Sequence, residues 1–196
     1  MQIIFATTNA GKVKEVKMLL NDLDADIFTM KEAGIDIDID ETGETFEENA
    51  LLKATGVMEE SDCLVLADDS GLEIDYLDGK PGVQSARFMG HDTPYSIKNK
   101  KILEMLEGVP EEKRTARFVS VIAAAFPDGR TVTARGTIEG IIGYEIKGEN
   151  GFGYDPIFYI PELGKYSAEL SLEEKNKISH RGKALRLMKQ KLKEMM

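Results

Sequence analysis

The stretch CLVLADDSGLEI, residues 63–74, raises the main structural question in this sequence, because two carboxylates follow an apolar run. Residues 63–67 are typical of a short strand buried in a core, and Asp68 and Asp69 come directly after it. Adjacent like charges repel each other, and an unpaired buried charge costs free energy. On an extended chain the two side chains would point to opposite faces. We therefore expect groups from distant segments to compensate these charges.

The bulk composition is that of a globular protein. The chain has 196 residues, 42% of them hydrophobic and 31% charged, which fits a single domain over residues 1–196 with one or two lobes. A net charge of -10 argues against binding to nucleic acid or to an anionic membrane through a broad basic face. The lone Cys63 excludes a disulfide framework within one chain. With neither a membrane-length apolar run nor a signal-peptide pattern, we expect a cytoplasmic protein.

Strand and helix patterns alternate at both ends of the chain. Residues 3–7 predict a buried strand, and apolar spacing predicts a helix from Val13. In the middle, residues 116–126 and 131–140 flank a PDGR turn and predict a hairpin. Other expected elements are a strand over residues 72–77, a loop entering a strand over 151–160, and helices beginning at Thr45–Glu48, Thr93-Pro94 (to about Leu106), Ser171–Glu174 and residue 183 (to 196). This order predicts an α/β fold with a mixed β-sheet.

Residues 7–12, TTNAGK, lie between the first expected strand and helix. Exposed N–H groups and the helix dipole at such a position favour an anion. Thr7 and Thr8 can donate hydroxyl hydrogen bonds, Gly11 lets a ligand approach the backbone, and Lys12 adds a charge. The segment lacks the P-loop spacing. A capped helix with a surface lysine explains the same pattern.

Two acidic pairs lie at the expected ends of elements. Asp40 and Glu41 precede a helix, and Asp68 and Asp69 follow the buried strand. Such carboxylates can converge on Mg²⁺, which accepts a few protein oxygens together with water and substrate phosphates. Solvated loop acids are the alternative, which fits the second pair less well because the preceding strand is apolar.

Aromatic and basic residues near the C-terminus could contact a ligand. Phe152 could stack on a planar ring, and Asp155 could accept hydrogen bonds from it; an aromatic turn entering the core is the alternative. A local group of basic residues stands out in an acidic protein: Lys175, Lys177, His180, Arg181 and Lys183. A basic helix end accounts equally well for this group.

Together these segments resemble the inosine triphosphate pyrophosphatase family over nearly the whole chain. The resemblance rests on five motifs in the family's order, at residues 6–15, 41–54, 67–88, 151–158 and 179–185. It implies hydrolysis of deaminated purine nucleoside triphosphates (ITP, dITP, XTP) to the monophosphate and pyrophosphate. It also implies Mg²⁺ as cofactor, a homodimer, and an elongated two-lobed mixed β-sheet flanked by helices, with the active-site cleft between the lobes.

The resemblance also assigns roles to residues. Asp69 matches the metal ligand and proton acceptor. Asp40 falls where relatives often carry the second acidic metal ligand as glutamate. Glu41 lies beside it, so either could reach the metal, and Asp68 is an auxiliary candidate. Thr8 departs from the glycine of many relatives. The implied substrate contacts are Thr7, Thr8, Asn9, Ala10, Gly11, Lys12, Ser70, Phe152, Gly153, Tyr154, Asp155, Lys175, His180 and Arg181.

Base selection would depend on position 6 of the purine. His180 and Arg181, as donors, would favour a keto group there and pair poorly with adenine. Two rival functions stay open at this point. One is a pyrophosphatase for other modified nucleotides, and the other is a nucleotide-binding module without turnover.

Overall fold

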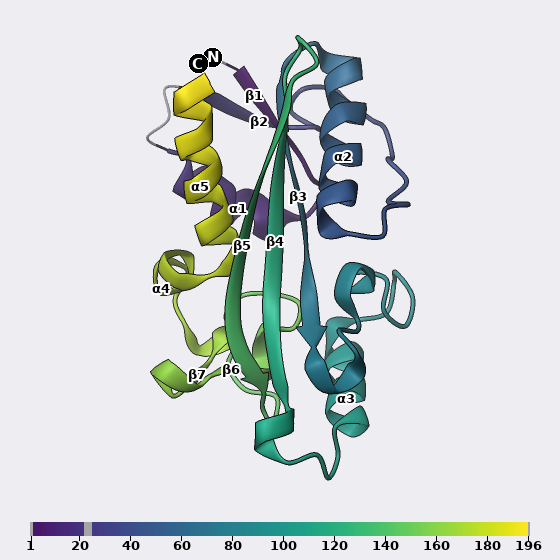
Figure 1. The fold of residues 1–196 in the computed structure, drawn as a ribbon, viewed down its shortest axis with the longest axis vertical. Coiled ribbons are helices and arrows are strands. Elements are labelled where there is room, and N and C mark those ends of the chain that lie inside the picture. Colours follow the sequence, from purple (N-terminus) through teal and green to yellow (C-terminus); the bar gives the residue numbers. More distant parts are fainter. Residues whose placement is uncertain (1, 22–24, 196) are drawn as a thin grey trace. The chain divides into compact units, whose positions relative to one another are not determined.

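A computed structural model describes residues 2–21 and 25–195, and its strands form one mixed sheet (Figure 1). In the described part of the chain the strand order is β2-β1-β3-β4-β5-β6-β7. The strands are β1 Gln2–Ala6, β2 Asp26–Thr29, β3 Leu64–Ile74, β4 Thr115–Ala125, β5 Thr131–Ile142, β6 Phe158–Ile160 and β7 Lys165–Tyr166. Strand β1 runs parallel to β2 and β3, whereas β6 runs antiparallel to β5 and β7. The predicted mixed α/β sheet is confirmed.

Helices flank this sheet. They are α1 Ala10–Leu19, α2 Phe46–Ser61, α3 Tyr95–Met105, α4 Leu172–Ile178 and α5 His180–Met195. Short 3-10 helices lie at Asp75–Leu77, Gly82–Gln84, Glu111–Lys113, Asp155–Ile157, Pro161–Leu163 and Ser167–Glu169. None of the described helices is both long and apolar enough to cross a membrane. The predicted C-terminal helix is confirmed as α5, except that residue 196 lies outside the described residues.

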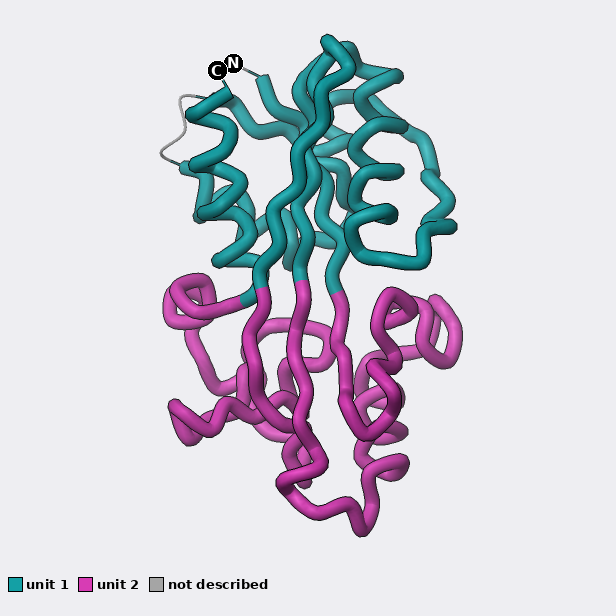
Figure 2. The backbone as a smooth tube through the Cα atoms, in the orientation of Figure 1, with its two compact units in different colours: residues 1–70, 120–136, 180–196 teal, residues 71–119, 137–179 magenta. Residues whose placement is uncertain are grey.

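The chain divides into two compact units, coloured separately in Figure 2. Unit 1 comprises residues 1–70, 120–136 and 180–196, and unit 2 comprises residues 71–119 and 137–179. Each unit has its own apolar core. Strands β3, β4 and β5 contribute residues to both units.

Strand alternation organises the core of unit 1. Leu64 and Leu66 of β3 belong to the same buried cluster as Val16 of α1 and Leu185 of α5. Side chains two residues apart share a face of a strand, so Asp68 continues this face. The alternate residues Val65, Ala67 and Asp69 face the other side, where Asp69 contacts Lys53 of α2.

Local signals placed most element boundaries correctly. The predicted capping boxes are present at the starts of α2 and α4. In each, the hydroxyl of the capping residue accepts from the backbone N–H of a glutamate, and the glutamate carboxylate accepts from the backbone N–H of the capping residue. The hairpin prediction is also confirmed. Strands β4 and β5 are hydrogen-bonded neighbours joined by the short turn 126–130, which only an antiparallel pair allows.

Four boundary predictions were wrong, one of them the start of α5, which lies at residue 180 rather than 183. Strand β3 does not end before Asp68 but continues to Ile74. Of the separate strand expected over residues 72–77, residues 72–74 belong to β3, whereas Asp75–Leu77 form a 3-10 helix. Helix α1 begins at Ala10 rather than Val13, because Asn9 caps it. Thr93 is not the N-cap of α3; its hydroxyl donates to the Met89 carbonyl, and Pro94 takes the cap position without a side-chain bond.

Candidate active site

Asp68 lies in the middle of β3 with its side chain fully buried, and four side chains contact its carboxylate. Oδ2 lies 2.8 Å from the Lys12 Nζ and 3.2 Å from the Arg181 Nε. Ser120 donates to Oδ1 at 2.7 Å, and Ser70 donates to Oδ2 at 3.3 Å. Burial alone would raise the pKa of Asp68, but the Arg181 and Lys12 charges outweigh it and hold that pKa well below its usual range. Asp68 is therefore an ionised and fully engaged carboxylate.

The same face of β3 holds a second buried ion pair. Arg181 donates through Nη1 to Glu15 of α1 and through Nη2 to the Ser70 hydroxyl at 2.9 Å. Glu15 and Arg181 are each 2% exposed. Two cations, Lys12 and Arg181, thus face two carboxylates, Asp68 and Glu15. This pairing of opposite charges offsets the free-energy cost of burying the four groups.

Asp69 faces the opposite side of the strand and has different partners. The Lys53 Nζ of α2 lies 3.3 Å from Asp69 Oδ1 and 2.6 Å from Glu41 Oε1, so one lysine joins the two acids. Within the described residues, Asp69 Oδ2 is buried and has no hydrogen-bond partner. Burial raises the pKa of Asp69; Lys53 opposes this shift and Glu41 adds to it. One cation against two carboxylates leaves an excess negative charge on this face.

The site fits a divalent cation. Asp69 offers a buried oxygen without a partner, and Glu41 lies across Lys53 from it. Among the described residues, no group of three or more histidine, cysteine or acidic side chains forms a ready-made cage. Mg²⁺ needs no such cage, because it binds through one or two carboxylates and completes its shell with water and phosphate. Asp40, the other candidate, is exposed, and the geometry favours Glu41.

The predicted phosphate loop adjoins this site through Lys12. Asn9 Oδ1 accepts hydrogen bonds from the Gly11 and Lys12 N–H groups at 2.9 and 3.1 Å, and the Thr7 hydroxyl accepts one from the Asn9 N–H at 3.2 Å. The side chain of Lys12 is not a solvated surface lysine, because it is 16% exposed and pairs with Asp68. Burial lowers the pKa of Lys12, and Asp68 opposes that shift. Within the same segment, Thr8 and Ala10 are exposed.

The predicted aromatic segment lies in unit 2 and is organised by Asp155. Asp155 Oδ2 accepts from the Lys175 Nζ at 2.7 Å and from the Phe152 N–H at 2.8 Å, while Oδ1 accepts from the Ser167 hydroxyl at 2.7 Å. The Lys175 Nζ lies 4.7 Å from the centre of the Phe152 ring. Asp155 is 2% exposed, so in this structure it holds the loop and the lysine in place. Gly153 and the buried Tyr154 belong to the same loop.

His180 and Arg181 begin α5, three residues before the predicted start at residue 183, and both are buried in unit 1. All three guanidinium nitrogens of Arg181 donate to groups of the protein. A base-reading role for either residue stays a prediction. Arg181 also has a structural role through these bonds, and that role was not predicted from the sequence.

Three side chains of the site were missed from sequence. Lys53 is the most important of them. It lies at helical spacing from the buried Phe46, Ala50 and Val57, and a lysine on the buried face of a helix is the signal that could have identified it. Glu15 likewise precedes the buried Val16 within α1. No local signal marks Ser120, which lies in the apolar strand β4.

The described residues therefore define a mixed α/β protein whose central strand carries two buried carboxylates, one neutralised by cations and one with an unpaired oxygen. A family model of the Ham1 family matches residues 3–191. The chain belongs to the Ham1 family.

Individual relatives agree with this assignment. A dITP/XTP pyrophosphatase of an Exiguobacterium species is 53% identical over 186 residues, covering 95% of this chain and 94% of that protein. A dITP/XTP pyrophosphatase of Desulforamulus reducens is 51% identical, with 95% and 92% covered. The solved structure of the Staphylococcus aureus Ham1 protein shares 41% identity at a TM-score of 0.90, and the match covers 100% of both chains. The resemblance found in the motifs is confirmed.

Proposed function

We propose that this protein is a Mg²⁺-dependent nucleoside triphosphate pyrophosphohydrolase that converts ITP, dITP and XTP to the monophosphate and pyrophosphate. Curated relatives about half identical over nearly the whole chain carry the name dITP/XTP pyrophosphatase. The observation within the chain that carries the proposal is the buried Asp69 oxygen without a partner, set beside Glu41 and Lys53.

Asp69 and Glu41 would hold the metal ion. When bound, Mg²⁺ supplies charge to offset the triphosphate and the developing negative charge of phosphoryl transfer. Lys53, which now bridges the two acids, would have a phosphate oxygen as an alternative partner. We place the triphosphate against residues 7–12, where Lys12 and the start of α1 supply positive charge.

The reaction needs one water molecule and releases one pyrophosphate. The water oxygen forms a bond to the α-phosphorus while the bond between that phosphorus and the bridging oxygen to the β-phosphate breaks. Asp69 would orient the water and accept its proton, and its position beside Lys53 keeps the carboxylate in place. Asp68 holds Lys12, Ser70 and Arg181 around the middle of β3.

The choice of base is proposed from the family's motifs. Phe152 would stack on the purine, and Lys175 and Asp155 would hold the loop that presents it. His180 and Arg181 would read the 6-keto group. We also propose a cytoplasmic homodimer whose substrate is a free nucleotide rather than nucleic acid.

Identification of the products tests the proposed reaction. Phosphorus NMR of ITP incubated with the protein and Mg²⁺ should show inosine monophosphate and pyrophosphate, and EDTA should stop their formation. Release of orthophosphate with inosine diphosphate would replace the proposal by a phosphohydrolase that cleaves the terminal phosphate.

A further inference from the structure

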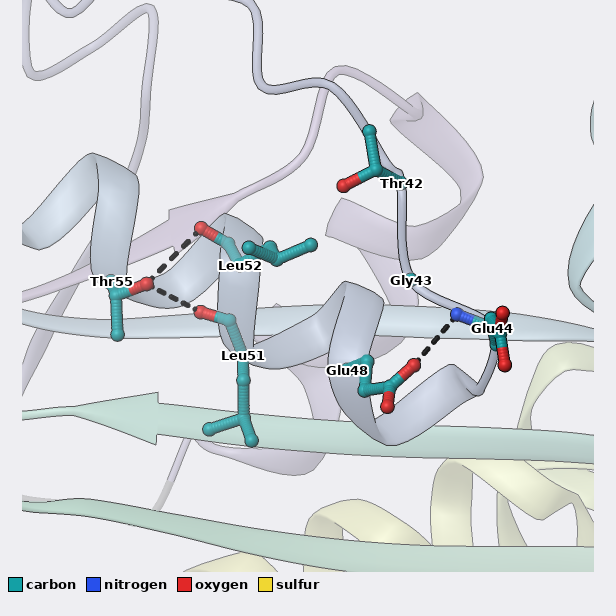
Figure 3. A pocket seen from close by; sticks show the side chains of 7 residues that line it. All are labelled: Thr42, Gly43, Glu44, Glu48, Leu51, Leu52 and Thr55. Carbon is teal, nitrogen blue, oxygen red and sulfur yellow. Dashed lines mark hydrogen bonds between the residues drawn. The ribbon is translucent and has the colours of Figure 1, made fainter.

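The segment that enters α2 is held by side chains from the first turns of that helix. The Gly43 N–H donates to Asn49 Oδ1 at 2.8 Å. The Glu44 and Thr45 N–H groups both donate to Glu48 Oε2, at 2.6 and 3.1 Å (Figure 3 shows the Glu44 bond). Three consecutive backbone donors are thus bound by two neighbouring side chains, which fixes the path of the backbone immediately after Glu41.

An open pocket borders one side of this segment. The pocket has a volume of about 420 Å³ and is lined by Thr42, Gly43, Glu44, Glu48, Leu51, Leu52 and Thr55 (Figure 3). One side of the segment therefore faces open space instead of packed side chains. The hydrogen bonds to α2 help to set its position.

Asn49 is the more unusual of the two anchors. It is 0% exposed, and its Nδ2 is buried without a hydrogen-bond partner among the described residues. A buried amide that is only half satisfied costs stability, so packing alone does not explain an asparagine here. What the residue does provide is the Oδ1 acceptor for Gly43, two residues from Glu41.

The geometry leaves little room at this contact. A Cβ added to Gly43 would lie 2.7 Å from Asn49 Oδ1 and 2.7 Å from Glu48 Cβ, closer than real Cβ atoms approach their neighbours. One turn further along α2, Lys53 contacts the Glu41 carboxylate at 2.6 Å. Helix α2 thus holds the Glu41 segment twice, at the backbone through Asn49 and at the carboxylate through Lys53.

We propose that Asn49 is a positioning residue for the metal site. Its hydrogen bond to Gly43 fixes the backbone so that the Glu41 carboxylate faces Asp69, and the two acids then bind a divalent cation together. This inference rests on the metal site of the proposed function. It adds that the affinity for the cation depends on a residue that touches neither the cation nor the substrate.

Titration of the nucleotide-free protein with Mn²⁺, followed by electron paramagnetic resonance, tests this role without any measurement of activity. Asn49→Leu removes the acceptor at similar size and should weaken Mn²⁺ binding by roughly 10- to 100-fold, as loss of a supporting group does in metal sites. Asn49→Asp keeps an acceptor oxygen at this position and should bind Mn²⁺ more tightly than Asn49→Leu does. Equal affinity of the parent and Asn49→Leu would overturn the proposal.

Two further variants keep the test decisive. Gly43→Ala disrupts the same contact from the loop side and should weaken Mn²⁺ binding in the same range, even if Asn49→Leu fails to fold. Thr55→Val is the matched control, because within the described part of the chain the Thr55 hydroxyl donates only to carbonyls of its own helix, those of Leu51 and Leu52. It should bind like the parent, and a loss equal to that of Gly43→Ala would show a general effect of α2 and overturn the proposal. A parent that binds no Mn²⁺ would also overturn it, whereas a parent that binds Mn²⁺ but releases no pyrophosphate would defeat only the proposed reaction.

Discussion

Asp68 and Asp69 are neighbours in sequence with opposite environments. The first is surrounded by Lys12, Arg181 and two serines, and its charge is neutralised. The second has a buried oxygen without a partner in the described residues and shares one lysine with Glu41. Alternation along the strand produces this difference, so the two aspartates should respond differently to the same substitution.

Asp69→Asn should leave the protein folded and nearly abolish hydrolysis. The change removes the proton acceptor and a metal ligand, so we expect kcat to fall by roughly 100- to 10,000-fold or more. Steady-state kinetics with ITP, together with thermal unfolding, checks both parts. Turnover close to that of the parent would contradict the assigned role.

Asp68→Asn should instead destabilise the fold. The substitution leaves Lys12 and Arg181 with one buried carboxylate fewer, and removal of one partner from a buried ion pair costs about 3 to 5 kcal/mol. Urea denaturation of the parent, Asp68→Asn and Asp69→Asn measures the difference in the free energy of unfolding. Similar losses for both variants would contradict the asymmetry described here.

The sequence identified the acids of the site more readily than their partners. Asp68 and Asp69 stood out because they follow an apolar run, and Lys12 because it lies at a helix start. Lys53 was missed because the segment after Thr45–Glu48 carries only the signals of a capped helix. Its function depends on tertiary contacts to β3, which no local pattern contains.

Among the elements, those with complete local signals were predicted and those stabilised by tertiary contacts were not. The capping boxes of α2 and α4 and the β4–β5 hairpin each carry their own turn or cap chemistry. Strand β3 does not, because the DDSG sequence is typical of a loop. Cations from α1, α2 and α5 compensate its charges, so the strand continues to Ile74.

The contact between α1 and the residues after β2 should make stability depend on pH. Glu32 accepts from the Thr29 N–H at 2.7 Å and from Lys17 at 3.1 Å, and these bonds, the Thr29 bond first, lower the pKa of Glu32 to about 2. A lowered pKa adds stability that is present above the ordinary pKa of 4.5 and is lost as the pH falls towards 2. Glu32→Gln should thus be less stable than the parent at neutral pH, and the difference should shrink between these two pH values. Denaturant melts across that range measure it; a difference that stays constant with pH would exclude this origin.

At the scale of the whole molecule, composition and motif order were more informative than any single site. A net charge of -10 argues against a broad surface for nucleic acid, yet Lys12, Lys53 and Arg181 gather around a single strand. Five motifs spread over residues 6–185 indicated the family, and the family model over residues 3–191 confirms it. The arrangement of the active-site cleft and the dimer stays a prediction.

The predicted homodimer is tested by mass. Light scattering on the protein as it elutes from a size-exclusion column should give about twice the chain mass of 21.7 kDa. A single chain mass at micromolar concentration would contradict the dimer and leave the site description unchanged.

The central claim is that this site removes deaminated purine nucleotides by pyrophosphate release. The most direct test is kcat/KM for pyrophosphate release from dITP, XTP and ITP beside dATP, ATP and GTP, at one Mg²⁺ concentration. The kcat/KM values for the three deaminated nucleotides should exceed those for the adenine nucleotides by at least about 100-fold, because a mismatched polar group at position 6 of the purine is costly. Equal kcat/KM values for ITP and ATP would contradict the central claim.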